Sequence, residues 1–205
     1  IPALPPCDTW VNIRALGAKG DGITNDTEVI RTAIAGNRTI YFPTGRYRVT
    51  DTITMKPDTV LIGLSPITTQ IIITDRTPAF DGDGPPKALL EAPKGGTNIV
   101  TGIGLNTHGI NHRAVAAKWM AGSNSLMNDV RFLGGHGTHN ADGSPVPVYN
   151  NNRTGDGNPE YRWDSQYWSL WITDGGGGTF KDIWTPSPYA QAGVCISNTA
   201  TEGRI

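Results

Sequence analysis

Three blocks of 18 residues that align without gaps constrain the fold more than any other feature of this sequence. They cover residues 88–105 (ALLEAPKGGTNIVTGIGL), 115–132 (VAAKWMAGSNSLMNDVRF) and 168–185 (WSLWITDGGGGTFKDIWT). The first two blocks begin 27 residues apart and the next interval is 53, so about one extra coil's worth of residues is inserted before the third. Self-similarity at a fixed period predicts a solenoid whose coils stack in register.

The aligned columns alternate as the two faces of a β-strand do. One column consists of glycines, which predicts a turn between two strands of each coil: Gly95, Gly122 and Gly175. Apolar columns should point inward: Leu90, Ala117 and Leu170; Ala92, Trp119 and Ile172; Ile103, Val130 and Ile183. The columns next to them should point outward: Glu91, Lys118 and Trp171; Gly104, Arg131 and Trp184. We expect Glu91 and Lys118 to form an ion pair between neighbouring coils.

The rest of the chain is organised around this repeat, which favours an all-β fold, a parallel β-helix. Residues 1–24 form a Pro-rich extended segment and an entry loop, and short β-rich runs follow at 39–42, 47–50, 59–62 and 70–74. The apolar spacing of Val29, Ile30, Ala33 and Ile34 predicts one helix over 25–36, with N-cap oxygens offered by residues 25–27. Residues 37–205 supply the coils, with a long inserted loop at about 134–166.

A further coil starts near residues 193–197, and no polar cap follows it before residue 205. A solenoid without a cap exposes a strand edge and its core. We therefore expect this chain to be the front portion of a longer polypeptide, with the remainder as its partner in the β-helix. Such a piece expressed alone should aggregate.

The charge balance excludes several classes of function. Seventeen Lys and Arg against 18 Asp and Glu give a net charge of −1, which argues against binding to nucleic acid or to an anionic membrane surface. No apolar run approaches the length of a membrane span. Cys7 and Cys195 are far apart and form no CxxC motif, so their pairing stays open.

The inserted loop brings carboxylates and aromatic residues together, the combination that sugar chemistry needs. Rings stack on the apolar face of a pyranose, and two carboxyl groups supply the acid and the base or nucleophile. The candidate catalytic residues are Asp164, Glu160 and Asp174. The candidate substrate-binding residues are Trp163, Trp171, Trp184, Tyr167, Arg131 and His136. Trp168 shares a column with Ala88 and Val115, so we expect it to face inward and to anchor the loop.

Motifs for metals and cofactors are incomplete. His108 and His112 have metalloprotease spacing, but no Glu follows the first His and no helical pattern surrounds them. Asp81-Gly-Asp-Gly84 and Asn140-Ala-Asp-Gly143 are similar to pieces of a calcium loop without its downstream Glu. We expect neither a metal nor a cofactor.

The N-terminal region resembles a known superfamily. Residues 12–27 (NIRALGAKGDGITNDT), Tyr41-Phe-Pro-Thr-Gly-Arg-Tyr47 and Leu61-Ile-Gly63 are similar to the opening pattern of pectate-lyase-like proteins, most of all to the group that contains glycoside hydrolase family 55. The resemblance implies a right-handed parallel β-helix, an N-terminal capping helix and a secreted, carbohydrate-active protein. Its motif residues are structural, and family 55 enzymes supply catalytic residues mostly later in the chain, so no catalytic residue is carried over.

Three functions remain open at this point. The first is a secreted glycoside hydrolase acting on a neutral β-glucan, in line with the near-zero charge and the available aromatics. The second is a polysaccharide lyase on a uronic-acid polymer, for which Lys118, Arg131 or Arg162 could supply the cation or base. The third is a non-catalytic glycan-binding or tailspike-type β-helix with the same aromatic face.

Overall fold

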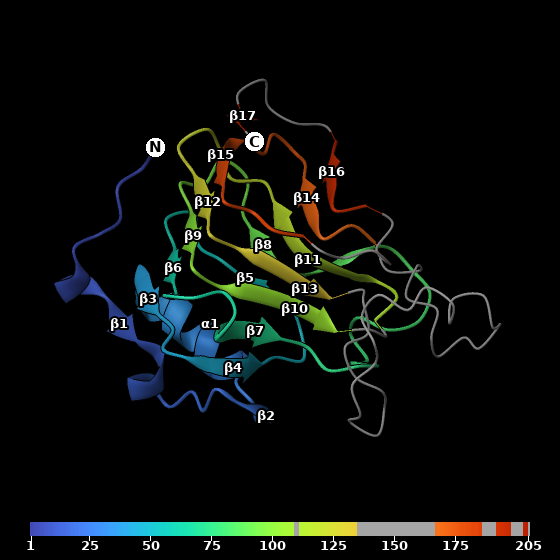
Figure 1. Ribbon diagram of the computed structural model, residues 1–205, viewed down its shortest axis with the longest axis horizontal. Helices are drawn as coiled ribbons and strands as arrows, with labels where there is room; N and C mark the ends of the chain where they lie inside the picture. Colours follow the sequence, from blue (N-terminus) through green and yellow to red (C-terminus); the bar gives the residue numbers. More distant parts are fainter. Residues whose placement is uncertain (109–110, 135–166, 186–191, 198–202, 205) are drawn as a thin grey trace.

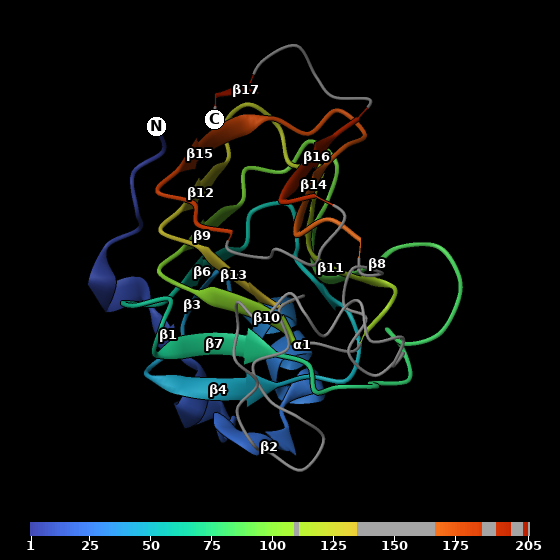
Figure 2. The ribbon, with the colours of Figure 1, turned by 45° about the vertical axis from the view of Figure 1, so that its right-hand side comes forward.

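The computed structural model describes residues 1–108, 111–134, 167–185, 192–197 and 203–204. It confirms the expected fold class, a right-handed parallel β-helix with a short helix near its N-terminus (Figure 1). Every strand pair in the described part of the chain is parallel, and the coils are stacked one above another in Figure 2. No helix within these ranges is both long and apolar enough to cross a membrane.

Three parallel sheets form the walls of the β-helix. Sheet A contains β1 (Val11–Asn12), β3 (Thr39–Tyr41), β6 (Val60–Ile62), β9 (Ile99–Thr101), β12 (Leu126–Asn128), β15 (Gly178–Lys181) and β17 (Gly203–Arg204). Sheet B contains β2 (Asp21–Asn25), β4 (Gly45–Arg48), β7 (Thr69–Ile72), β10 (Gly104–His108) and β13 (Arg131–Gly134). Sheet C contains β5 (Ile53–Thr54), β8 (Lys87–Ala92), β11 (Ala114–Trp119), β14 (Leu170–Ile172) and β16 (Val194–Ile196). The 3₁₀ turns are η1 (Cys7–Thr9) and η2 (Ile13–Leu16).

The register of the stack follows the gap-free alignment of the three blocks. In sheet C, Ala117 lies between Leu90 and Leu170. In sheet A, Leu126 pairs with both Ile99 and Thr179. In sheet B, Arg131 pairs with Gly104 and forms a bridge with Trp184. The predicted intervals of 27 and 53 residues are therefore confirmed in all three sheets.

The inward columns fill the interior as predicted. All but one of their residues are buried, and the exception, Ile183, is partly buried and packs against the core. Trp119 has 1% of its surface exposed, and its Nε1 donates to Ser125 Oγ at 3.2 Å and to Gly177 O at 3.1 Å. Its ring meets that of Phe180 edge-on at 5.9 Å. The largest side chain of the repeat is thus buried with its N–H group hydrogen-bonded. It joins β11 to the segments that contain Ser125 and Gly177.

Helix α1 (Thr27–Gly36) covers the N-terminal end of the core through Ile30, Ala33 and Ile34 (Figure 1). Its first turn is held by Asn25, whose Oδ1 accepts from the backbone N–H of Thr27 at 3.1 Å. The carboxylate of the neighbouring Asp26 is buried and instead accepts from the N–H groups of Lys19 and Gly20, at 2.8 and 2.9 Å. These bonds hold the glycine-rich entry loop against the helix.

The structure answers the open question of cysteine pairing and corrects the expected ion pair between Glu91 and Lys118. Cys7 and Cys195 are both free. Glu91 and Lys118 are neighbours in register, yet within the described ranges the ammonium of Lys118 pairs with Asp174 at 3.8 Å rather than with Glu91. The long lysine side chain leans along the wall, and its Nζ lies 5.2 Å from the centre of the Trp171 ring. Strand register therefore places Glu91 and Lys118 side by side but does not determine which carboxylate Lys118 pairs with.

The ion pairs of Asp51 predict that the protein loses stability in acid. It pairs with Lys87 at 2.7 Å and with Arg31 at 3.1 Å, and joins the start of sheet C to helix α1. Partial burial raises its pKa, but hydrogen bonds from Lys87, the Thr52 N–H and Arg31 outweigh this and lower the pKa to about 2. Because the Asp51 carboxyl has a lower pKa in the folded protein than in the unfolded chain, its charge stabilises the folded state at pH values above about 3.9. This contribution is lost as the pH falls toward 2.

Urea unfolding of wild type and Asp51→Asn at pH 6, 4 and 2.5 measures this contribution. Because the carboxylate is part-exposed, we expect the difference between the proteins to be ~1 kcal/mol or less at pH 6 and to shrink at pH 2.5. A difference that stays constant over this range would contradict the assignment to the Asp51 charge.

Candidate functional site on the outer face of sheet C

A row of outward side chains crosses the coils of sheet C. Register places Thr54, Glu91, Lys118, Trp171 and Cys195 side by side on consecutive strands. Neighbouring strands are about 4.8 Å apart, so the row forms a continuous strip along the β-helix axis. Their inward neighbours Leu90, Ala117 and Leu170 are buried, so the strip rests on a packed wall.

Aromatic rings gather at one end of this strip. The ring of Trp171 meets that of Trp168 at 5.6 Å and 68°, and Trp168 meets Tyr167 at 5.3 Å and 73°. The expectation that Trp168 points inward was therefore wrong. It precedes β14, where the chain has just entered the sheet, and its ring packs on the outward Trp171. The Trp171 Nε1 donates to Ser197 Oγ at 2.9 Å, which fixes the ring orientation.

Charged groups stand next to these rings. Asp174 follows β14 in a left-handed backbone conformation (φ 50°), and its Oδ2 lies 3.8 Å from Lys118 Nζ. Glu91 flanks Lys118 on the strand away from Trp171. The strip thus presents two carboxylates, one ammonium and an aromatic cluster, the groups that bind a sugar ring and exchange protons with it.

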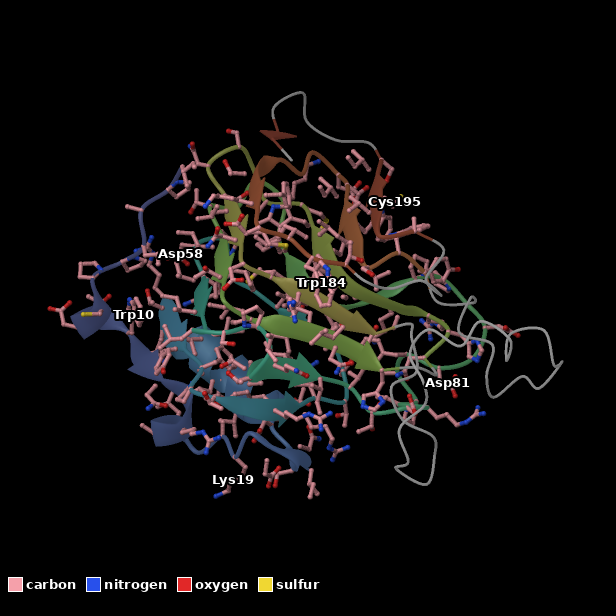
Figure 3. The ribbon with its side chains drawn as sticks, in the orientation of Figure 1. Trp10, Lys19, Asp58, Asp81, Trp184 and Cys195 are labelled. Atoms are coloured by element: carbon pink, nitrogen blue, oxygen red, sulfur yellow. The ribbon has the colours of Figure 1, made fainter. Side chains whose placement is uncertain are left out.

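A second polar cluster lies where the chain passes from sheet B to sheet C. His108 Nδ1 is 3.2 Å from Asp75 Oδ1, with 14% and 20% of the side chains exposed. His112 Nε2 and Arg76 Nη1 both lie 3.8 Å from the carboxylate of Asp81 (Asp81 is labelled in Figure 3). A histidine oriented by a carboxylate is suited to move a proton.

The inserted loop joins the wall beside both groups. It begins after Gly134, which is paired in register with His108. The chain returns at Tyr167, whose hydroxyl donates to the carbonyl oxygen of Gly84 at 3.0 Å. That carbonyl belongs to the same β7–β8 loop as Asp75 and Asp81. The ends of the insertion therefore flank the polar cluster and the aromatic cluster.

The predicted site residues fall into three groups. Asp174, Trp171 and Tyr167 lie together at the sheet C strip. Arg131 and Trp184 lie elsewhere, on sheet B. The remaining candidates lie outside the described residues: Asp164, Glu160, Trp163 and His136. Among the residues that the structure describes, no group of three His, Cys, Asp or Glu is arranged to hold a metal ion.

Sequence reasoning missed the pair of His108 and Asp75. A signal was present: Gln70 pairs with Gly104, an interval of 34 residues that extends to align His108 with Thr74, next to Asp75. The three-block alignment did not include this earlier coil.

Comparisons with known proteins agree with the fold. A family model described as rhamnogalacturonase A/epimerase, pectate lyase-like, matches residues 10–198. Alginate lyase 7 from Azotobacter vinelandii is 51% identical over 43 residues, covering 18% of this chain and 5% of that protein. A glucan 1,3-beta-glucosidase from Cochliobolus carbonum is 34% identical over 59 residues, covering 27% and 8%. The matches thus cover less than a tenth of either relative.

A solved structure extends the likeness to nearly the whole chain. The catalytic unit of a thermostable GH87 alpha-1,3-glucanase from Streptomyces thermodiastaticus superposes with a TM-score of 0.53 at 13% identity. The superposition covers 96% of this chain and 34% of that chain. At such low identity this likeness concerns the fold alone.

Proposed function

Since the chain belongs to the rhamnogalacturonase A/epimerase, pectate-lyase-like family of carbohydrate-active β-helix proteins, we propose that it forms part of a glycoside hydrolase that cleaves a β-glucan. The proposed enzyme type is that of the β-1,3-glucanases of glycoside hydrolase family 55. The local identity with a glucan 1,3-beta-glucosidase supports this choice. So does the near-zero net charge, which suits a neutral polymer.

The observation that carries the proposal is the aromatic cluster on the outer face of sheet C. The ring of Trp168 contacts those of Trp171 and Tyr167 edge to face, and Trp171 lies directly beside Lys118 of the Lys118–Asp174 ion pair. Aromatic faces bind pyranose rings without needing charge on the sugar. The polymer would follow the strip along the β-helix axis and pass from ring to carboxylate.

Asp174 and Glu91 are the described carboxylates that could act on a glycosidic bond in this strip. One carboxylic acid would protonate the leaving-group oxygen, and the other carboxylate would attack the anomeric carbon or activate a water. Lys118 is the register neighbour of Glu91 and pairs with Asp174, and it would hold the carboxylate that must stay ionised. Asp164 and Glu160 remain candidates for the same roles.

A lyase or epimerase acting on a uronic-acid polymer is the second candidate, and the polar cluster favours it. His108, oriented by Asp75, would remove the proton next to the sugar carboxylate. Arg76 is the nearby cation that could neutralise that carboxylate. The identity with alginate lyase 7 supports this alternative over a short segment.

Incubation of the intact protein with laminarin and with polygalacturonate separates these functions. A glucan hydrolase releases reducing sugar from laminarin without a change in ultraviolet absorbance. A lyase generates an unsaturated product from polygalacturonate that absorbs in the ultraviolet. We expect the first result. Cleavage of polygalacturonate alone would overturn the proposal in favour of the second candidate, and binding without cleavage of either would indicate a non-catalytic module.

A polysaccharide substrate also accounts for the remaining expectations. Such polymers lie outside cells, so we propose that the protein is secreted. We further propose that the remainder of a longer polypeptide adds coils to this β-helix and lengthens the strip.

A further inference from the structure

The ammonium group of Lys118 lies over the aromatic ring to which the proposed function assigns sugar binding. Its Nζ is 5.2 Å from the centroid of the Trp171 ring. Other contacts hold the ring itself, since its Nε1 donates to Ser197 Oγ at 2.9 Å and Trp168 meets it at 5.6 Å and 68°. The ring is therefore fixed in place, whereas the cation over it sits at the end of a flexible side chain.

The side of the ring that Lys118 covers is the side that faces the carboxylates of the strip. Lys118 stands on β11, between β8 with Glu91 and β14 with Trp171. The same ammonium is 3.8 Å from Asp174 Oδ2, so a sugar stacked here would lie next to that carboxylate. A pyranose binds an aromatic ring through its face. The sugar and the ammonium therefore require the same place.

Lys118 has two carboxylates within its reach. Asp174 is its present partner, and 3.8 Å is at the limit of an ion pair and too long for a hydrogen bond. Glu91 is its register neighbour on the adjacent strand, whose backbone is about 4.8 Å away, well within the span of a lysine side chain. Because 45% of the Asp174 side chain and 23% of the Lys118 side chain are exposed, this ion pair contributes little to stability. Exchanging one carboxylate for the other therefore costs little free energy.

We propose that Lys118 is a two-position switch that couples sugar binding to the arrangement of charges on the strip. Without a ligand, the ammonium lies over Trp171 and pairs with Asp174. A neutral pyranose that stacks on this side of the ring displaces the ammonium, which then pairs with Glu91. The sugar shifts the equilibrium because it binds only the second arrangement.

The exchange ends the ion pair of Asp174 at the moment when the sugar arrives beside it. It also leaves the cation next to Glu91, which makes Glu91 the carboxylate that Lys118 holds ionised during the reaction. This inference rests on the proposed function and extends it to the regulation of the same site.

Binding of a short, soluble β-1,3-linked glucose oligosaccharide to the intact protein tests the switch. Tryptophan fluorescence immediately after rapid mixing gives the dissociation constant before cleavage lowers the ligand concentration. The variants are Lys118→Ala, Glu91→Gln and the two together. The matched control is Lys181→Ala, which removes a lysine that pairs with Asp182 at 2.9 Å at the end of β15 in sheet A. Melting temperatures establish that each variant is folded.

We expect Lys118→Ala to bind the oligosaccharide about fivefold more tightly than wild type, because the sugar no longer has to displace a cation from the ring. Glu91→Gln should weaken binding by about threefold, because the displaced ammonium loses its second partner. In the double variant the Glu91 substitution should have no effect, since the residue through which it acts is absent. Lys181→Ala should bind as wild type does.

Weaker or unchanged binding by Lys118→Ala would overturn the proposal, because the ammonium would then contact the sugar directly or play no part. An effect of Glu91→Gln that is equal with and without Lys118 would also overturn it, as would a wild-type protein that binds no glucan. Failure of the glucanase proposal is a separate result, in which wild type binds the oligosaccharide but releases no reducing sugar from laminarin. Cleavage of laminarin together with unaltered binding by Lys118→Ala would refute the switch alone.

Discussion

Asp174→Asn is expected to lower the turnover of the polysaccharide by a factor of about 10² to 10⁴, the usual contribution of a positioned acid or base. Glu91→Gln should have an effect of the same order if the two carboxylates share the reaction. Both side chains flank Lys118 on the sheet C strip, and Asp174 lies beside the ring cluster that would hold the sugar. Initial rates on laminarin at saturating substrate measure the change.

Asp182→Asn is the matched control for this experiment. Asp182 and Asp174 have nearly the same left-handed backbone conformation, φ 53° and 50°, which asparagine adopts readily. Asp182 also pairs with a lysine, Lys181, at 2.9 Å, but it lies just after β15 of sheet A. Its substitution should leave turnover within about twofold of wild type. If Asp174→Asn and Glu91→Gln also keep near-normal turnover, catalysis resides elsewhere, with Asp164 and Glu160 as the next candidates.

Trp119→Ala is expected to lower the free energy of unfolding by about 3–5 kcal/mol, the range for truncating a large buried aromatic side chain. The side chain is 1% exposed, packs edge-on against Phe180 and donates to Ser125 and Gly177. The substitution removes this volume from between neighbouring coils and leaves Gly177 O without the indole N–H. Urea denaturation followed by circular dichroism gives the difference.

Trp171→Ala tests the same prediction from the other face of the wall. Trp171 pairs with Lys118, the residue before Trp119. Because successive residues of a strand point to opposite faces, the side chains of Trp171 and Trp119 lie on opposite faces of the sheet. Trp171 points outward, so its loss should cost ~1 kcal/mol or less in stability while it weakens binding to laminarin. Comparable destabilisation by the two substitutions would contradict the assignment of the two faces.

The pairing of strands was available from the sequence because it is a periodic property. Each coil must present the same face to the interior, so intervals of 27 and 53 residues align inward with inward positions along the whole block. Leu90, Ala117 and Leu170 could be placed together without any structure. The helix was equally accessible, since the spacing of Ile30, Ala33 and Ile34 and the oxygen of Asn25 act within a few residues.

The contacts within the site required the tertiary structure, because they depend on the reach of side chains and on the course of the chain beyond the strands. Lys118 reaches Asp174, 56 residues later, instead of its register neighbour Glu91, because a long flexible side chain is free to choose among nearby charges. His108 and Asp75 lie at and just beyond the ends of β10 and β7, so the chain that leaves these strands sets their contact. Strand alternation determined whether each residue faces inward or outward, whereas loop geometry and side-chain reach decided which of the outward residues touch.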